Sequence, residues 1–228
     1  MTGKTLFASL AVVGLGAFAT AAEAQVCIGF PNQPAQAAVA LSSNFPADAD
    51  QFGVEGSMNL EGPLAVHAGY QRTTARGQAG GHANTFRAGA ALEVTERYVG
   101  PFALHLSACP TVSASLTRME GAEVWQVPLG VGIGGRIEAG PQGTLEFMPY
   151  AVPQLVWTRA RVEQGVQPGL FDPLFGRQAA VAEREQTDLG LRTGVLVGAG
   201  RLYLGGEYSN VFNDGLGGTF GVKAGVRF

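Results

Sequence analysis

The stretch Gly218–Phe228, GTFGVKAGVRF, separates into two unlike sets when every second residue is taken. One set is apolar and consists of Phe220, Val222, Ala224, Val226 and Phe228. The alternate set is small or polar and consists of Thr219, Gly221, Lys223, Gly225 and Arg227. Because successive side chains of a β-strand point to opposite sides, this stretch predicts a strand with one face against an apolar medium.

The same alternation recurs upstream, and no helical 3.6-residue stripe competes with it. We therefore predict an all-β protein of about ten antiparallel strands, with eight as the alternative. The ten stretches are 35–45, 51–60, 64–74, 85–95, 102–116, 122–137, 144–162, 187–198, 201–212 and 218–228. Pro110, Pro128, Pro149 and Pro153 fall inside these stretches, and each lacks a backbone donor, so we expect bulges or strand ends there.

The connections between the stretches alternate in length. Short, turn-like connections at 61–63, 96–101, 138–143 and 199–200 follow the even-numbered stretches, and two of the others are clearly longer, 75–84 and 163–186. Outer-membrane barrels have short periplasmic turns, longer outside loops and an even number of strands. The order of turns predicts a closed, up-and-down barrel with both chain ends on the short-turn side.

The first 24 residues have the pattern of a cleaved secretory signal peptide. Lys4 precedes an apolar run from Leu6 to Ala19, and Ala22-Glu23-Ala24 is a small-x-small cleavage site. We divide the chain into a signal peptide (1–24), an N-terminal segment that lies in the periplasm or plugs the lumen (25–34), and a barrel (35–228).

An amphipathic last strand with a terminal Phe228, behind such a leader, resembles the bacterial outer-membrane β-barrels of the porin-like and OmpA-transmembrane-like superfamily. The resemblance implies a location in the outer membrane of a Gram-negative-type bacterium and contact with its lipid. It also implies that the assembly machinery reads the last strand through Phe220, Val222, Val226 and Phe228.

The composition agrees with a β-protein whose strands contain many glycines. The chain has 34 glycines, 14% charged and 46% hydrophobic residues, which suit neither disorder nor a helical bundle. The net charge of −3 and the absence of a basic run give no indication of nucleic-acid binding.

Periodicity alone leaves open which face of the barrel is inside. In a secreted soluble barrel the apolar set would line a ligand cavity, whereas in a membrane barrel it would face lipid. Many glycines share the polar face, and small residues are needed where side chains converge inside a narrow cylinder, so we place the polar face inside. Since buried charges are costly unless paired, we predict a lumen ion-pair network of Glu55, Arg87, Glu93, Arg136, Glu146, Asp188, Arg192, Glu207, Lys223 and Arg227.

Such a lumen is either filled or a narrow channel, because about ten strands enclose little space and open porins need about sixteen. Cys27 and Cys109 are the only cysteines, and exported proteins fold in an oxidising compartment. We hypothesise a Cys27–Cys109 disulfide that holds the N-terminal segment in the lumen. The alternative is two unpaired thiols.

Enzymatic chemistry has little support in the sequence. His105 and Ser107 are similar to the H-x-S pair of outer-membrane lipid A deacylases, but that pair faces lipid and this one shares the inward face with Glu93 and Arg136. No metal-ligand spacing appears, and we expect no cofactor and no catalytic residue.

The long connection 163–186 carries Leu170, Phe171, Leu174 and Phe175. These residues either contact an extracellular partner or fold over the barrel mouth. We expect a non-catalytic protein that is structural, adhesion-like or a narrow solute channel. A soluble carrier of an apolar ligand and a lipid A deacylase-like enzyme are the alternatives.

Overall fold

The structure is a computed structural model, and the residues that it describes are 27–30, 37–46, 49–60, 63–76, 81–99, 104–119, 121–139, 144–162, 183–212 and 218–228; for 95–99 and 162 it describes the backbone alone. The expected signal peptide, residues 1–24, lies outside the described residues, as does 163–182 of the long connection. Within the described part no helix is long and apolar enough to cross a membrane.

The described elements are eleven strands. They are β1 (Ala37–Phe45), β2 (Ala49–Asn59), β3 (Leu64–Ala75), β4 (His82–Leu92), β5 (Thr95–Val99), β6 (Leu104–Met119), β7 (Ala122–Ala139), β8 (Leu145–Val162), β9 (Glu183–Ala199), β10 (Leu202–Val211) and β11 (Thr219–Arg227).

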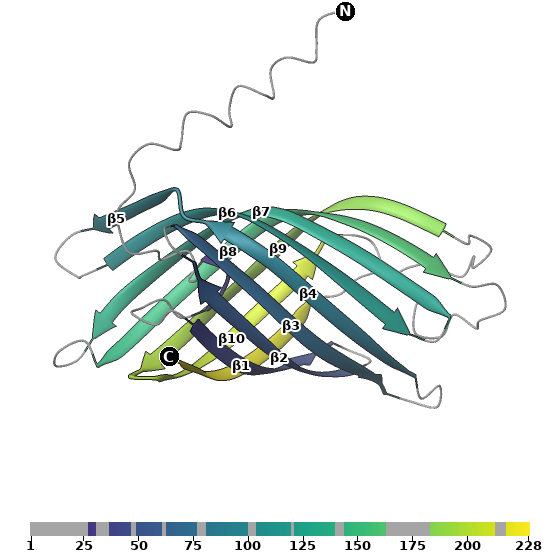
Figure 1. The fold of residues 1–228 in the computed structure, drawn as a ribbon, viewed down its shortest axis with the longest axis horizontal. Coiled ribbons are helices and arrows are strands. Elements are labelled where there is room, and N and C mark those ends of the chain that lie inside the picture. Colours follow the sequence, from purple (N-terminus) through teal and green to yellow (C-terminus); the bar gives the residue numbers. More distant parts are fainter. Residues whose placement is uncertain are drawn as a thin grey trace, which may run out of the picture.

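Ten of these strands close into one antiparallel barrel in which neighbours in sequence are neighbours in space (Figure 1). The closure is made by β1 and β11, with Ala38 opposite Arg227 and Phe45 opposite Phe220. The amide of Phe228 donates to the carbonyl of Ala37 at 2.9 Å, so pairing continues past the end of β11. The predicted fold class is confirmed, and the strand number is ten rather than eight.

The short strand β5 was not predicted. It continues β4 along β6 with a shift of register, because the three residues Leu92–Val94 lie opposite the two residues Cys109 and Pro110. An extra residue on one strand of an antiparallel pair is a β-bulge. Among the described residues β5 pairs with β6 alone and extends past the end of β4 (Figure 1).

The expectation of bulges or strand ends at the four prolines is met at Pro110 and is wrong at the other three. Pro110 lies beside the β4–β5 bulge, but the registers on either side of Pro128, Pro149 and Pro153 are unchanged. The β7–β8 ladder omits Pro149 and Pro153, whereas both keep register partners on β9. A proline removes one donor from one side of a strand, and pairing on the other side carries the strand through.

Several strands extend beyond their predicted ends toward the side where β3 leads to β4, which we call the loop side. β6 continues to Met119, β9 begins at Glu183, and β6 to β9 are 16 to 18 residues long. Residues Glu183–Gln186, expected in the long connection, are therefore part of a strand. The sequence did not predict these extensions, because polar residues interrupt the apolar alternation there.

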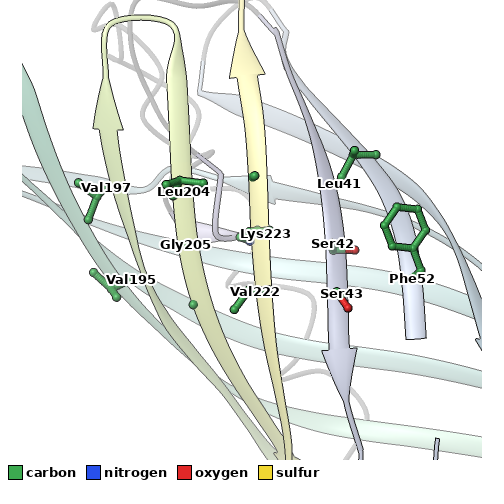
Figure 2. Close-up of a pocket in the computed structure, with 12 residues that line it drawn as sticks. Leu41, Ser42, Ser43, Phe52, Val195, Val197, Leu204, Gly205, Val222 and Lys223 are labelled. Atoms are coloured by element: carbon green, nitrogen blue, oxygen red, sulfur yellow. The ribbon is translucent and has the colours of Figure 1, made fainter. Parts of the chain in front are cut away.

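The apolar set of each of the ten barrel strands faces outward. Leu189, Leu202 and Leu204 are each more than 60% exposed. Figure 2 shows this wall across β9, β10, β11, β1 and β2, where Val197, Leu204, Leu41 and Phe52 border a shallow apolar hollow. Inward side chains such as Met148 and Leu196 are fully buried. The polar face is thus the inner one.

Candidate functional site: the closed lumen

A tight turn formed by Cys27–Phe30 lies inside the barrel, and we call it the plug. Cys27 forms a disulfide with Cys109 on the inward face of β6. Cys27, Ile28 and Phe30 are at most 3% exposed and belong to one core cluster with Cys109, Met148 and Leu196. The N-terminal segment, of which residues 27–30 are described, therefore fills part of the lumen and is attached covalently to its wall.

Two glycines make room for the plug. Gly29 has a positive φ of 76°, and a Cβ there would meet the Tyr150 ring at 2.5 Å. Gly132 lies opposite Cys109, and a Cβ at this position would meet the Cys27 carbonyl oxygen at 2.5 Å. Since glycine alone adopts positive φ without strain, Gly29 is fixed by both backbone and space.

Cations of the wall bind the plug backbone. Arg192 on β9 donates to the Ile28 carbonyl at 2.7 Å, and Lys223 on β11 donates to the Gly29 carbonyl at 2.5 Å. The Lys223 ammonium also lies over the rings of Phe30 and Tyr150, 5.2 and 5.5 Å from their centres. Buried carbonyls need hydrogen-bond partners, and these cations supply them from the side of the lumen opposite the disulfide.

The same cations pair with Glu207 on β10. Its carboxylate lies 3.5 Å from Lys223 and 3.9 Å from Arg192, and it accepts a hydrogen bond from the Tyr150 hydroxyl. Glu207, Arg192 and Lys223 thus form one cluster, and we call it the plug clamp. It compensates a buried carboxylate and fixes the plug at the same time.

Two further pairs join members of the sequence-predicted network. Arg87 on β4 lies 3.0 Å from Glu55 on β2, and Arg227 on β11 lies 2.6 Å from Glu146 on β8. Arg227 also donates to the Gly200 carbonyl at 2.6 Å. The first pair joins strands two apart in the barrel order, and the second joins strands three apart.

The remaining predicted lumen residues also point inward. Arg136 on β7 is buried and pairs with Glu138, 3.2 Å away, which was not in the predicted network. Glu93 is buried at the β4–β5 bulge, where its amide donates to the Pro63 carbonyl at 2.8 Å. Asp188 lies on the inward face of β9, outside the plug clamp.

The packing of the lumen differs between the two ends of β6. Ser107 and Cys109 are buried, whereas Ser113, Ser115 and Thr117, nearer the loop side, are partly exposed. Hydroxyls and amides bond across strands there, as in the pairs Thr85–Thr117 at 2.8 Å and Gln71–Gln51 at 2.6 Å. The loop-side half is polar and open to solvent, and the other half is packed.

His105 and Ser107 both lie on the inward face of β6, and Ser107 is 4% exposed. No group of three or more His, Cys, Asp or Glu residues in the described part could hold a metal ion.

Sequence reasoning missed the interior aromatic residues. Tyr150 and Tyr203 are at most 3% exposed, and glycines at 194 and 225 leave space for their rings. The signal was present, because both tyrosines fall on the polar face of their strands and the facing positions are glycines. The plug residues Ile28 and Phe30 carried no periodic signal.

The described residues define a closed, ten-stranded, up-and-down β-barrel with an apolar outer wall and an occupied, charge-compensated lumen. No protein-family model matches the chain, and no curated protein matches it in sequence. Among solved structures it is similar to Ail, the attachment invasion locus protein of Yersinia pestis, with 11% identity over 84% of this chain and 95% of that chain and a TM-score of 0.30. A likeness this low carries no inference about function.

Proposed function

We propose that this chain is an integral outer-membrane β-barrel protein with a sealed lumen and a structural or adhesion-like role at the cell surface. The observation that carries the proposal is the outer wall, where large apolar side chains are exposed on the strands around the barrel. Soluble proteins rarely expose contiguous apolar patches of this kind. In hydrocarbon every backbone group must pair within the protein, and the β1–β11 pairing meets that need.

The direction of the apolar side chains argues against a secreted carrier of an apolar ligand. Such a carrier would place them around an internal cavity, yet the lumen holds the plug and the ion pairs. Leu41, Phe52 and Leu204 instead line the outer wall (Figure 2).

The plug argues against a solute channel at rest. A disulfide and two hydrogen bonds to charged groups hold Cys27–Phe30 in the lumen. Planar-bilayer recordings of the purified protein should therefore give almost no conductance. Steady single-channel currents from the wild-type protein would favour the narrow-channel alternative.

Catalysis is not part of the proposal. Ser107 is buried on the inward face, so a lipid outside the barrel does not reach the His105–Ser107 pair. Lipid A modification that disappears in His105→Ala would support the enzyme alternative.

Membrane insertion is tested by fractionation and gel mobility. We expect the protein in the outer-membrane fraction, soluble only with detergent, with a mobility in cold detergent gels that shifts on heating. We also expect assembly to depend on the outward residues Phe220, Val222, Val226 and Phe228. A mature chain that stays monomeric in plain buffer would contradict the proposal.

A further inference from the structure

One cross-strand row on the outer face marks the loop-side end of the apolar wall. In this row Arg72 on β3 lies opposite Asn84 on β4, and Asn84 lies opposite Arg118 on β6. The row continues through Glu123 and Arg161 to Glu183 on β9. From β3 to β7 the outward face changes from apolar to charged or polar at this row, whereas on β8 and β9 charge begins one row earlier, at Arg159 and Glu185.

The first three residues of this row present hydrogen-bond donors. Arg72 is exposed, and its side chain has no ion pair or hydrogen bond within the part of the chain that the structure describes. The Asn84 carbonyl oxygen accepts from the Tyr70 hydroxyl at 2.6 Å, which leaves the amide nitrogen as the outward group. The Arg118 side chain is 65% exposed and lies 3.3 Å from Glu123, so much of its donor surface faces out.

Neighbours in a cross-strand row are about 5 Å apart, so these donors span roughly 10 Å. Guanidinium groups bind phosphate oxygens through paired hydrogen bonds. Arg118 pairs with Glu123 much as Arg161 pairs with Glu183, whereas Arg72 has no carboxylate partner among the described residues. Arg72 and Arg118 together carry two positive charges against the single carboxylate of Glu123, which leaves a net positive charge at this end of the row.

The surface below these donors suits a lipid. Tyr70 and Phe86 occupy the next row, with ring centres 5.1 Å apart, and aromatic side chains of this kind lie at membrane interfaces. The row after that holds the exposed small residues Ala68, Ala88 and Ala114. Moving from the loop side, the order is donors, aromatic rings and a shallow apolar strip.

We propose that Arg72, Asn84 and Arg118 bind the phosphate headgroup of an anionic lipid in the loop-side leaflet, with its acyl chain along the alanine strip. This inference rests on the proposed membrane location. Charge complementarity selects the occupant, because the donors border an apolar wall and an anionic lipid carries a phosphate and a hydrocarbon chain in one molecule.

The test measures lipid retained by the detergent-purified barrel in native mass spectrometry, with phosphatidic acid or phosphatidylcholine added to the micelles. The wild-type protein should retain phosphatidic acid at least about 10-fold more strongly, because a phosphomonoester offers more negative charge to paired guanidinium groups. The double variant R72Q/R118Q should lose this preference. Equal retention of the two lipids by the wild-type protein would overturn the proposal.

Two matched controls remove exposed, ion-paired arginines that lie outside the proposed site. R76Q breaks the pair with Asp50, and R161Q breaks the pair with Glu183. Both should retain phosphatidic acid as the wild-type protein does, and a loss equal to that of R72Q/R118Q would indicate non-specific attraction. Millimolar inorganic phosphate should not displace the lipid; full displacement would assign the site to a free anion and contradict a lipid site.

Heat-modifiable gel mobility is recorded for every variant. A heat-modifiable, membrane-inserted barrel that lacks the lipid preference rejects this inference and leaves the proposed function intact. A protein that never inserts rejects the proposed function itself.

Discussion

Arg227 and Arg72 occupy strands of one sheet but lie on opposite faces, and their surroundings differ. Arg227 is 6% exposed and lies 2.6 Å from the Glu146 carboxylate. Arg72 is exposed and has no side-chain partner in the described part of the chain. The contrast indicates that inward charges hold the barrel together, whereas Arg72 at the loop-side rim is available to other molecules.

The largest expected effect comes from breaking an inward pair. Glu146→Gln keeps the size of the side chain but removes the charge that compensates Arg227. Removing one partner of a buried ion pair costs about 3–5 kcal/mol, and we expect a loss near the lower end because Glu146 keeps 11% of its side chain exposed. Urea unfolding of the protein in phospholipid vesicles measures this loss in the free energy of unfolding.

The matched control for this variant is Asp50→Asn on the outer rim. Asp50 pairs with Arg76, and both side chains are at least half exposed. Surface pairs contribute little, so the unfolding midpoint should stay unchanged. If both variants lose equal stability, the two faces do not differ as described.

Removal of the disulfide should have the next largest effect. Cys27 and Cys109 are 82 residues apart in sequence, and a disulfide that closes a loop of this size typically contributes about 2–4 kcal/mol. Cys27→Ser, Cys109→Ser and the double variant should lose the same amount in vesicle unfolding. A wild-type protein whose cysteines both react with a thiol label without reductant would contradict the bond.

A charge placed on the outward face should cost according to its depth. Leu129 lies within the apolar wall of β7, and Leu129→Arg should lower the free energy of unfolding by about 2–4 kcal/mol. Leu116 lies beside the rim row, and Leu116→Arg should lower it by about 0–1 kcal/mol. Unfolding in vesicles distinguishes the two. Equal costs would indicate that the wall does not cross hydrocarbon.

The smallest expected effect is a pH response at the loop-side rim. The hydrogen bond from Arg159 lowers the pKa of Glu183 below its ordinary value. Because the pKa of Glu183 is lower in the folded protein than in the unfolded one, its pair with Arg159 stabilises the fold fully above the ordinary glutamate pKa. This stabilisation is lost as the pH falls through the lowered pKa of Glu183. An NMR titration of Glu183 should show this, and Arg159→Gln should return the pKa toward its ordinary value.

Much of the fold could be predicted from period-two alternation, because lipid on one side and a narrow lumen on the other constrain every strand. Gly218–Phe228 and the stretch that became β10 carry this pattern cleanly. The alternation did not predict the bulge between β4 and β5, because the position of the bulge depends on the facing residues Cys109 and Pro110 of β6. Register between strands is a tertiary property that local sequence does not contain.

The lumen could be predicted only in part, for the same reason. The inward direction of Glu207 and Lys223 follows from parity, but their joint contact with the plug depends on where Cys27 is fixed. Tyr150 was overlooked because a tyrosine inside a narrow barrel needs glycines on facing strands, and that match is visible only once the strands are paired.

The central claim is that the outward side chains contact hydrocarbon, and Trp157 on β8 tests it directly. With Trp125→Phe, Trp157 is the sole tryptophan, because the chain has two. In vesicles with brominated acyl chains, we expect its fluorescence to be blue-shifted and strongly quenched, with little further quenching by aqueous acrylamide. Quenching by acrylamide but not by the brominated lipid would contradict the claim.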